Sequence, residues 1–366
     1  MDKLRVGIIG CGNIAPAYFK GCDLFRILEA VACADLNAEA AQARATEFKV
    51  KALTVDELLA SPEIDLVVNL TIPQVHAAIS RRALEAGKHV HSEKPLGITL
   101  EEGGALVKAA KTAKRRLGCA PDTFLGAGLQ TCRKVIDDGW IGRPLGGTAF
   151  MMCRGPESWH PNPAFFYERG GGPMLDMGPY YITALVHLLG PVKAVSAVAV
   201  KSFPDRLATC AQQFGKRLPV AVPTHSSGTL IFASGAVVTV CISFDVHAHT
   251  HSPIEIYGSE GSLQVPDPNG FGGDVKLFRP DSGQWQPFGF SHGYRENSRG
   301  IGAADLAHSV RSGRPHRCSG DLALHVLEVM LTFERASETG RTLEIAHHCT
   351  QPAALPLGLI TGVLDD

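Results

Sequence analysis

The chain has 366 residues, which at about 150 residues per domain predicts roughly two domains. Lysine and arginine total 35 and aspartate and glutamate total 36, so the formal charge of −1 argues against nucleic acid as a partner. A content of 45% hydrophobic and 19% charged residues suits a large core and argues against disorder. Because no apolar run reaches the roughly 18 residues of a membrane span, and an apolar strand begins at Leu4, we expect neither a transmembrane helix nor a signal peptide.

Ten cysteines and 15 histidines raise the question of redox or metal chemistry. No two cysteines form a Cys-x-x-Cys pair, so we expect buried thiols in a reducing cytoplasm. The alternation of His247, His249 and His251 would place three potential zinc ligands on one side of a strand. Since no nearby Cys, Asp or Glu completes an obvious ligand set, we interpret them as a polar strand face or sheet interface and predict no metal site.

Strands and helices alternate in the first third of the chain. Short apolar runs predict buried parallel strands over residues 4–9, 30–34, 66–70 and 89–91. A helix rich in Ala, Leu and Arg is predicted over residues 75–86.

The first strand runs into a G-x-G-x-x-A turn that opens a helix, with the sequence Gly10-Cys11-Gly12-Asn13-Ile14-Ala15. Gly10 permits the tight turn, Gly12 allows close approach of a pyrophosphate, and Ala15 allows the helix to pack closely. The pyrophosphate would lie on the positive end of the helix. The turn, including Asn13 and Ile14, therefore predicts a dinucleotide site, with a plain structural turn as the alternative.

The second strand closes on Asp35, 25 residues after Gly10. This is close to the spacing expected for an acid that binds the adenosine ribose hydroxyls. A carboxylate repels a 2′-phosphate, and Leu36 and Asn37 supply no arginine. We therefore expect NAD in preference to NADP.

Three segments further along the chain carry recognisable motifs. They are Ala86-Gly87-Lys88-His89-Val90-His91-Ser92-Glu93-Lys94-Pro95, Gly170-Gly171-Gly172-Pro173-Met174-Leu175-Asp176-Met177-Gly178 and Thr71-x-Pro73-x-x-His76. They resemble the A-G-K-H-V-x-x-E-K-P, G-G-G-x-L-x-D-x-G and T-P-x-x-x-H segments of the Gfo/Idh/MocA oxidoreductases, which include glucose-fructose oxidoreductase and inositol dehydrogenase. Ile72 splits the family's Thr-Pro pair. With the glycine turn, the resemblance covers nearly the whole chain.

The resemblance implies an α/β plus α+β architecture. A Rossmann domain would be followed by a domain with a large, open, mainly antiparallel sheet that shields the nicotinamide and often forms a homodimer or homotetramer interface. We place the boundary at residue 122, giving domains 1–122 and 123–366. Strands are predicted over 147–153, 195–202, 226–232, 236–245 and 254–257, and a core helix over 322–337.

Lys94 follows the fourth predicted strand and so lies at the carboxyl edge of the parallel sheet, where ligands of such folds bind. The resemblance implies that this lysine reaches the reacting hydroxyl or carbonyl oxygen of the substrate and that the Lys-Pro peptide is often cis. A cation there stabilises alkoxide character on the substrate oxygen. Glu93, Thr71, Pro73 and His76, with Lys94, are the matching candidates for the cofactor site.

Asp176 and Tyr180 are one helical turn apart and can face the same cleft. The family pattern is D-x-G-x-H, with the histidine as general base and the aspartate positioning it. This chain has a tyrosine instead, whose ordinary pKa of about 10 requires a neighbouring cation for base chemistry. Lys94 can supply that charge, so we predict that Lys94, Tyr180 and Asp176 manage the hydroxyl proton. The alternative is that Tyr180 only packs on the nicotinamide or sugar ring.

His160 is the competing candidate for the base. It lies in a proline-bracketed polar loop with Trp159, shortly before Tyr167, and such loops often line sugar sites. We predict that all three bind substrate. Asp122 and Thr123 stand where family members have substrate-contacting residues, so we count them as substrate-binding candidates as well.

Other polar residues leave their roles open. We expect His187 to be a buried, hydrogen-bonded core residue. Arg295, Asn297 and Arg299 precede a glycine turn and either contact substrate or anchor the loop.

We predict an NAD(P)-dependent oxidoreductase that transfers hydride between nicotinamide and a secondary hydroxyl or keto group of a sugar, polyol or sugar derivative. One alternative is glycoside cleavage in which bound NAD acts as a redox catalyst without net turnover. Another is a non-catalytic protein that senses sugar and NAD.

Overall fold

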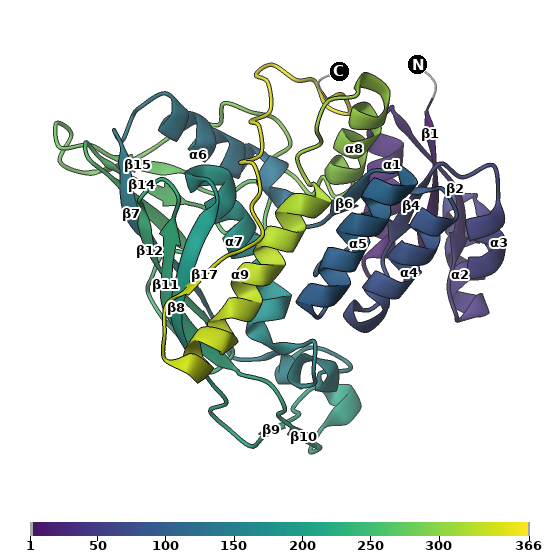
Figure 1. The fold of residues 1–366 in the computed structure, drawn as a ribbon, viewed down its shortest axis with the longest axis horizontal. Coiled ribbons are helices and arrows are strands. Elements are labelled where there is room, and N and C mark those ends of the chain that lie inside the picture. Colours follow the sequence, from purple (N-terminus) through teal and green to yellow (C-terminus); the bar gives the residue numbers. More distant parts are fainter. Residues whose placement is uncertain (1–2, 365–366) are drawn as a thin grey trace.

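The computed structural model describes residues 3–364, which form two large sheets with helices packed between and around them (Figure 1). The purple and blue N-terminal part holds one sheet, and the teal and green C-terminal part holds the larger one. Helix α9, in yellow-green, runs between them. It packs on β8 of the larger sheet and on α5 of the first part.

The first sheet is parallel and, within residues 3–364, has six strands in the order β3-β2-β1-β4-β5-β6. The strands are β1 (Leu4–Ile9), β2 (Leu28–Ala34), β3 (Lys51–Leu53), β4 (Leu66–Asn69), β5 (His89–Ser92) and β6 (Leu117–Cys119). The helices are α1 (Ala15–Leu24), α2 (Ala38–Phe48), α3 (Val55–Ala60), α4 (Pro73–Glu85) and α5 (Leu100–Ala113). This is the Rossmann strand order, which reverses direction beside β1 and opens a crevice at the carboxyl ends of the strands. The predicted parallel sheet is confirmed, with strand ends shifted by one or two residues.

The second sheet is mixed and mostly antiparallel, and the described residues give it nine strands in the order β16-β15-β14-β13-β7-β12-β11-β8-β17. β7 and β12 are parallel, and the other neighbouring pairs are antiparallel. The strands are β7 (Pro144–Met152), β8 (Val192–Val200), β11 (His225–Phe232), β12 (Val237–Ser243), β13 (Ile254–Gly258), β14 (Ser262–Val265), β15 (Lys276–Phe278), β16 (Trp285–Pro287) and β17 (Leu343–Glu344). The predicted large open sheet is confirmed.

Four longer helices and several short segments complete the second part. The helices are α6 (Ala127–Asp137), α7 (Gly172–Leu189), α8 (Ile301–Ser312) and α9 (Gly320–Thr339). The short segments are the hairpin β9 (Asp205–Leu207) and β10 (Arg217–Pro219), and the 3-10 turns η1 (Thr123–Leu125), η2 (Pro156–Ser158), η3 (Ala164–Tyr167) and η4 (Ala211–Gln213). Both α8 and α9 pack against β6 of the first sheet. The domain boundary at residue 122 stays a prediction.

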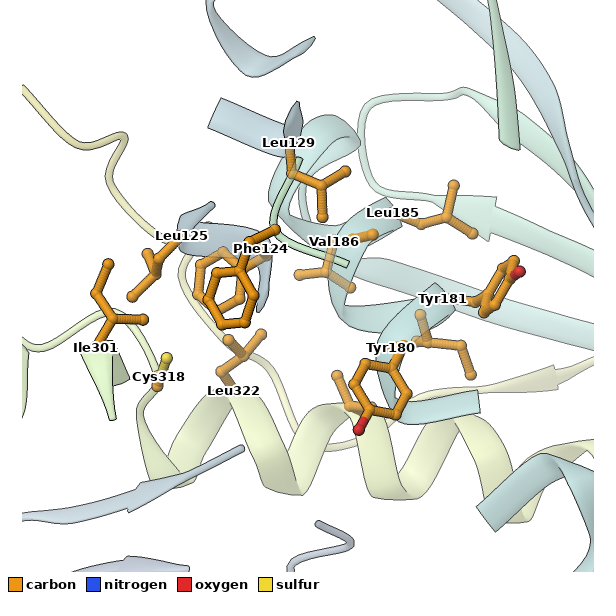
Figure 2. Close-up of a cluster of buried hydrophobic side chains, with 14 of the residues drawn as sticks. Phe124, Leu125, Leu129, Tyr180, Tyr181, Leu185, Val186, Ile301, Cys318 and Leu322 are labelled. Atoms are coloured by element: carbon orange, nitrogen blue, oxygen red, sulfur yellow. The ribbon is translucent and has the colours of Figure 1, made fainter. Parts of the chain in front are cut away.

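A buried apolar cluster fixes α7 against its neighbours (Figure 2). Phe124 of η1, Leu129 of α6, and Leu185 and Val186 of α7 are all at most 2% exposed. Burying side chains of this size contributes about 1.5–3 kcal/mol each. Tyr180 lies at the edge of this cluster with its hydroxyl pointing away from Phe124. The packing of α7 therefore determines where the first half of the helix presents its polar side chains.

The predicted strand face formed by His247, His249 and His251 is wrong, because β12 ends at Ser243 and the three histidines lie in an irregular segment. Arg154 Nη1 lies 3.1 Å from His247 Nε2, His249 and His251 stack, and His251 packs on Phe150. In residues 3–364 no group of three His, Cys, Asp or Glu side chains is arranged to hold a metal ion. No helix in the same range is long and apolar enough to cross a membrane.

Candidate active site

The glycine turn after β1 has the geometry of a phosphate cradle. Gly10 has φ +102°, and a Cβ there would lie 2.5 Å from the carbonyl oxygen of Leu70. A Cβ on Gly12 would meet no atom of the described residues within 4 Å, so this backbone faces open space. Ile14, the N-cap of α1, makes no side-chain capping hydrogen bond. The helix start is therefore available to an anion, whose charge the helix dipole stabilises.

A cavity of about 910 Å³ continues from this turn and is lined by Gly10, Gly12, Asp35, Leu36 and Thr71 among others. The Asp35 carboxylate accepts hydrogen bonds from the backbone N–H of Cys11 and of Asn37, both at 2.8 Å. Leu36 is 99% exposed at the rim. An open glycine cradle, an uncapped helix start, an acid and an apolar rim suit the pyrophosphate, ribose and adenine of a dinucleotide.

The Thr71 and Pro95 loops are joined by His76, which is buried on α4. One ring nitrogen of His76 is 2.9 Å from the carbonyl oxygen of Pro95, and the other is 2.8 Å from that of Thr71. Burial lowers the pKa of His76, and the hydrogen bonds to the two carbonyl oxygens oppose that shift. The Thr71 hydroxyl donates to Asn69 Oδ1 at 2.7 Å, and Pro73 is the first residue of α4. His76 and Thr71 thus hold the site loops together.

Lys94 and Asp176 form the centre of the site. The Lys94–Pro95 peptide bond is cis, and Lys94 Nζ lies 2.8 Å from Asp176 Oδ1 and 2.6 Å from the Asp176 carbonyl oxygen. The two side chains are 15% and 27% exposed, so the ion pair is only partly screened by solvent. The loop after β5 and the first turns of α7, far apart in sequence, thus bring Lys94 and Asp176 together. Their roles in the reaction stay predictions.

Tyr180 lies one turn further along α7 and is close to two cations. Lys94 Nζ lies 5.2 Å from the centre of its ring, and Arg299 Nη2 donates to its hydroxyl at 3.5 Å. The Tyr18 hydroxyl donates to Glu93 Oε1 at 2.7 Å, and Glu93 is 9% exposed. Tyr18 was not predicted, because it lies on α1 outside any motif.

These groups shift one another's proton affinities. Burial alone lowers the pKa of Lys94, but the charges of Asp176, Tyr180 and Glu93 outweigh it and raise that pKa above its ordinary value. Burial raises the pKa of Tyr180, and the positive charges of Lys94 and Arg299 lower it only in part. At neutral pH both Lys94 and Tyr180 therefore carry their protons.

His160 is half-buried in the loop between η2 and η3. Its Nδ1 accepts the backbone N–H of Asn162 at 3.0 Å, so in the neutral ring the proton is on Nε2. In this geometry Nε2 can donate a hydrogen bond but cannot take a proton. Trp159 is 66% exposed and meets the His160 ring edge-on. The loop thus presents an aromatic surface, as expected for a sugar contact.

Tyr167 lies away from this surface. It is fully buried, and its hydroxyl donates to Glu157, whose carboxylate also faces Arg206 at 3.2 Å. Burial raises the pKa of the Tyr167 hydroxyl. This places Tyr167 in a network that anchors the loop, in contrast to the predicted contact with substrate.

Asp122 and Thr123 are also buried. The Asp122 carboxylate accepts the backbone N–H groups of Gly300 and Gly302 at 2.9 and 3.1 Å, which fixes the start of α8. This is an anchoring role, in contrast to the predicted contact with substrate. His187 is buried against Phe124 and lies 3.2 Å from Gln130, as expected for a core histidine.

Comparisons with known proteins agree with this architecture. Residues 4–120 match the family model "Oxidoreductase family, NAD-binding Rossmann fold", and residues 129–264 match "GFO/IDH/MocA C-terminal domain". The chain is 31% identical over 264 residues to 1,5-anhydro-D-fructose reductase of Ensifer adhaerens, covering 71% of this chain and 74% of that protein. It is 33% identical over 270 residues to dTDP-3,4-didehydro-2,6-dideoxy-alpha-D-glucose 3-reductase of Saccharopolyspora spinosa, covering 72% and 74%.

Among solved structures, levoglucosan dehydrogenase in complex with NADH and levoglucosan has a TM-score of 0.81 at 22% identity. The match covers 94% of this chain and all of that one, which supports the fold. The motifs, the two sheets and these relatives together show that the chain belongs to the Gfo/Idh/MocA family of NAD(P)-binding oxidoreductases.

Proposed function

We propose that this protein interconverts a secondary hydroxyl and a keto group on a sugar, polyol or sugar derivative. The observation that carries this proposal is the constellation of Lys94, Asp176 and Tyr180. His76 joins the Lys94–Pro95 loop to Thr71, which lines the dinucleotide cavity. Relatives named for sugar reduction, 1,5-anhydro-D-fructose reductase and the dTDP-sugar 3-reductase, support the substrate class.

Different residues would bind each part of the cofactor. The glycine turn, with Asn13 and Ile14, would hold the pyrophosphate, Asp35 would bind the adenosine ribose, and Glu93 and Lys94 line the nicotinamide end. A bound nicotinamide supplies or takes the hydride. NAD is our preferred cofactor, because Asp35 repels a 2′-phosphate and exposed Leu36 offers it no positive charge.

Lys94 and Tyr180 act on the substrate oxygen. Lys94 stabilises negative charge there, and Asp176 holds the lysine by its carboxylate and its main-chain oxygen. Because Tyr180 is protonated at neutral pH, it gives its proton to the oxygen of a ketone during reduction. We infer that reduction is the favoured direction near neutral pH and that oxidation gains rate in alkali.

The open face of the second sheet supports self-association (Figure 1). Thr229, Thr239 and Thr148 lie side by side on β11, β12 and β7, flanked by exposed Val198 and Val237. Glu255 is the charged neighbour of Thr148 on this face. A face of threonines and exposed valines suits a homodimer or homotetramer interface. Light scattering after gel filtration measures the assembly directly. The free thiols of the ten cysteines favour a reducing compartment such as the cytoplasm.

A panel of sugars, ketosugars and polyols assayed with NADH and NAD⁺ tests the function, with Lys94→Ala as the diagnostic variant. We expect cofactor-coupled turnover in the wild type and its loss in Lys94→Ala with NAD binding intact. Retained turnover in the variant refutes the mechanism. Sugar release without net NADH change would indicate redox-assisted glycoside cleavage, and cofactor binding without turnover would indicate a sensor.

A further inference from the structure

Arg299 lies in the segment before α8, and its backbone is clamped on both sides. A Cβ on Gly21 of α1 would lie 2.0 Å from the Arg299 carbonyl oxygen, so the two backbones are in direct contact. The next residue, Gly300, has φ +98° and donates its N–H to Asp122 at 2.9 Å. Asp122 also accepts the N–H of Gly302, and the Arg299 N–H donates to Asn297 Oδ1 at 3.3 Å. The arginine side chain therefore starts from a fixed point between the two parts of the molecule.

The guanidinium of Arg299 reaches the Tyr180 hydroxyl, with Nη2 at 3.5 Å. Nη1 is buried and has no hydrogen-bond partner among residues 3–364. Besides Tyr180, the groups that face the guanidinium are Glu93, Asp122 and Tyr18. Both carboxylates are at least nine-tenths buried, so the arginine compensates two anions that are shielded from water.

The charges around Tyr180 come from three elements. Lys94 and Glu93 face it from the loop after β5, and Arg299 faces it from the segment before α8. On its own helix, Asp176 pairs with Lys94. The two cations are the groups that favour the phenolate over the phenol, whereas burial and Glu93 oppose it.

We propose that Arg299 is a positioning residue that holds the Tyr180 hydroxyl and stabilises the negative charge left there when the proton goes to the substrate oxygen. This inference rests on the proposed function, because it needs Tyr180 to exchange a proton during turnover. The proton moves from the tyrosine hydroxyl to the oxygen of the ketone in reduction and returns in oxidation. Arg299 keeps its own protons throughout.

Arg299→Gln removes the charge and tests the proposal through the pH dependence of both directions. An opposite charge at this distance shifts the pKa of its neighbour by about 1–3 units. In Arg299→Gln we expect the alkaline fall of the reduction rate to move at least about one pH unit higher. Oxidation at pH 8 should fall about tenfold or more, since less phenolate is present. Arg299→Lys, which keeps the charge, should restore most of the oxidation rate.

Arg311→Gln is the matched control, because Arg311 lies in the last turn of α8, the helix that follows Arg299, and is exposed. We expect its pH profiles to match the wild type. If Arg299→Gln fails to fold because Glu93 and Asp122 lose their compensating charge, the charge-balanced double variant Arg299→Gln/Asp122→Asn gives the same comparison.

A double-mutant cycle with Tyr180→Phe separates this inference from the proposed function. If Arg299 acts through Tyr180, Arg299→Gln has little further effect on oxidation in the Tyr180→Phe background. The role of Arg299 is overturned if the two substitutions lower the oxidation rate additively. It is also overturned if the reduction rate of Arg299→Gln falls at the same alkaline pH as that of the wild type. Full activity of Tyr180→Phe alone instead overturns the proton role of Tyr180 in the proposed function.

Discussion

Replacing Asp176 by asparagine tests the ion pair at the centre of the site while keeping the size of the side chain. At 2.8 Å and an effective dielectric constant of about 20, the gross attraction between Lys94 and Asp176 is about 6 kcal/mol. Desolvation offsets most of it, because the two side chains are only 15% and 27% exposed. We expect a net loss of about 2 kcal/mol in the free energy of unfolding.

The kinetic effect should be a fall in kcat of about 10- to 100-fold, since a small displacement of a catalytic group has an effect of this size. Lys94 retains its bond to the Asp176 carbonyl oxygen, so Asp176→Asn should be less damaging than Lys94→Met. NAD affinity should stay unchanged in both variants. Urea denaturation, fluorescence titration with NADH and steady-state kinetics provide the three measurements.

The matched control is Asp321→Asn, which breaks the Lys111–Asp321 pair of nearly the same length, 2.9 Å, between side chains that are 68% and 53% exposed. Such an exposed pair contributes at most about 1 kcal/mol. If Asp176→Asn and Asp321→Asn have equal effects on stability and turnover, the reasoning on the buried pair is refuted.

Three further predictions concern the residue that gives its proton to the substrate, the stability of the fold in acid, and the preference for NADH or NADPH. Tyr180→Phe should slow the chemical step by about 10²-fold or more, while His160→Ala should mainly raise KM. If only His160→Ala abolishes the chemical step in single-turnover kinetics, the proton transfer is reassigned to His160. Burial lowers the pKa of His91 to about 4 in the folded chain. As pH falls from about 6.5 to 4, the unfolded chain therefore binds a proton at His91 that the folded chain does not bind. The native state should then lose up to about 3 kcal/mol through His91 alone, and urea midpoints at several pH values should show a weaker acid loss in His91→Asn. Asp35→Ser/Leu36→Arg should raise the ratio of kcat/KM for NADPH over NADH by about 10- to 100-fold, because an arginine at the rim can pair with the 2′-phosphate. An unchanged ratio would place the adenosine ribose elsewhere.

The parts of the fold that sequence predicts well are those set by local pattern. The apolar runs and the spacing from Gly10 to Asp35 predict the parallel sheet and its crevice, because both depend on residues close together in the chain. That Lys94 and Asp176 serve one site is implied by the family resemblance and by no spacing rule, since 82 residues separate them.

The roles that sequence did not resolve depend on orientation and on distant contacts. Arg299 lies 119 residues from Tyr180, and no spacing rule connects them. Tyr167 and Asp122 lie where the resemblance and local composition predict substrate contacts, but the fold turns both inward to Glu157 and to the start of α8. Chain position alone does not tell which way a polar side chain points.

A crystal structure of the ternary complex with NADH and a sugar or polyol found by thermal-shift screening would locate the reacting oxygen. We predict one substrate oxygen within hydrogen-bond distance of both Lys94 Nζ and the Tyr180 hydroxyl, with its carbon facing C4 of the nicotinamide. A substrate oxygen bound to His160 and away from Lys94 and Tyr180 would contradict it.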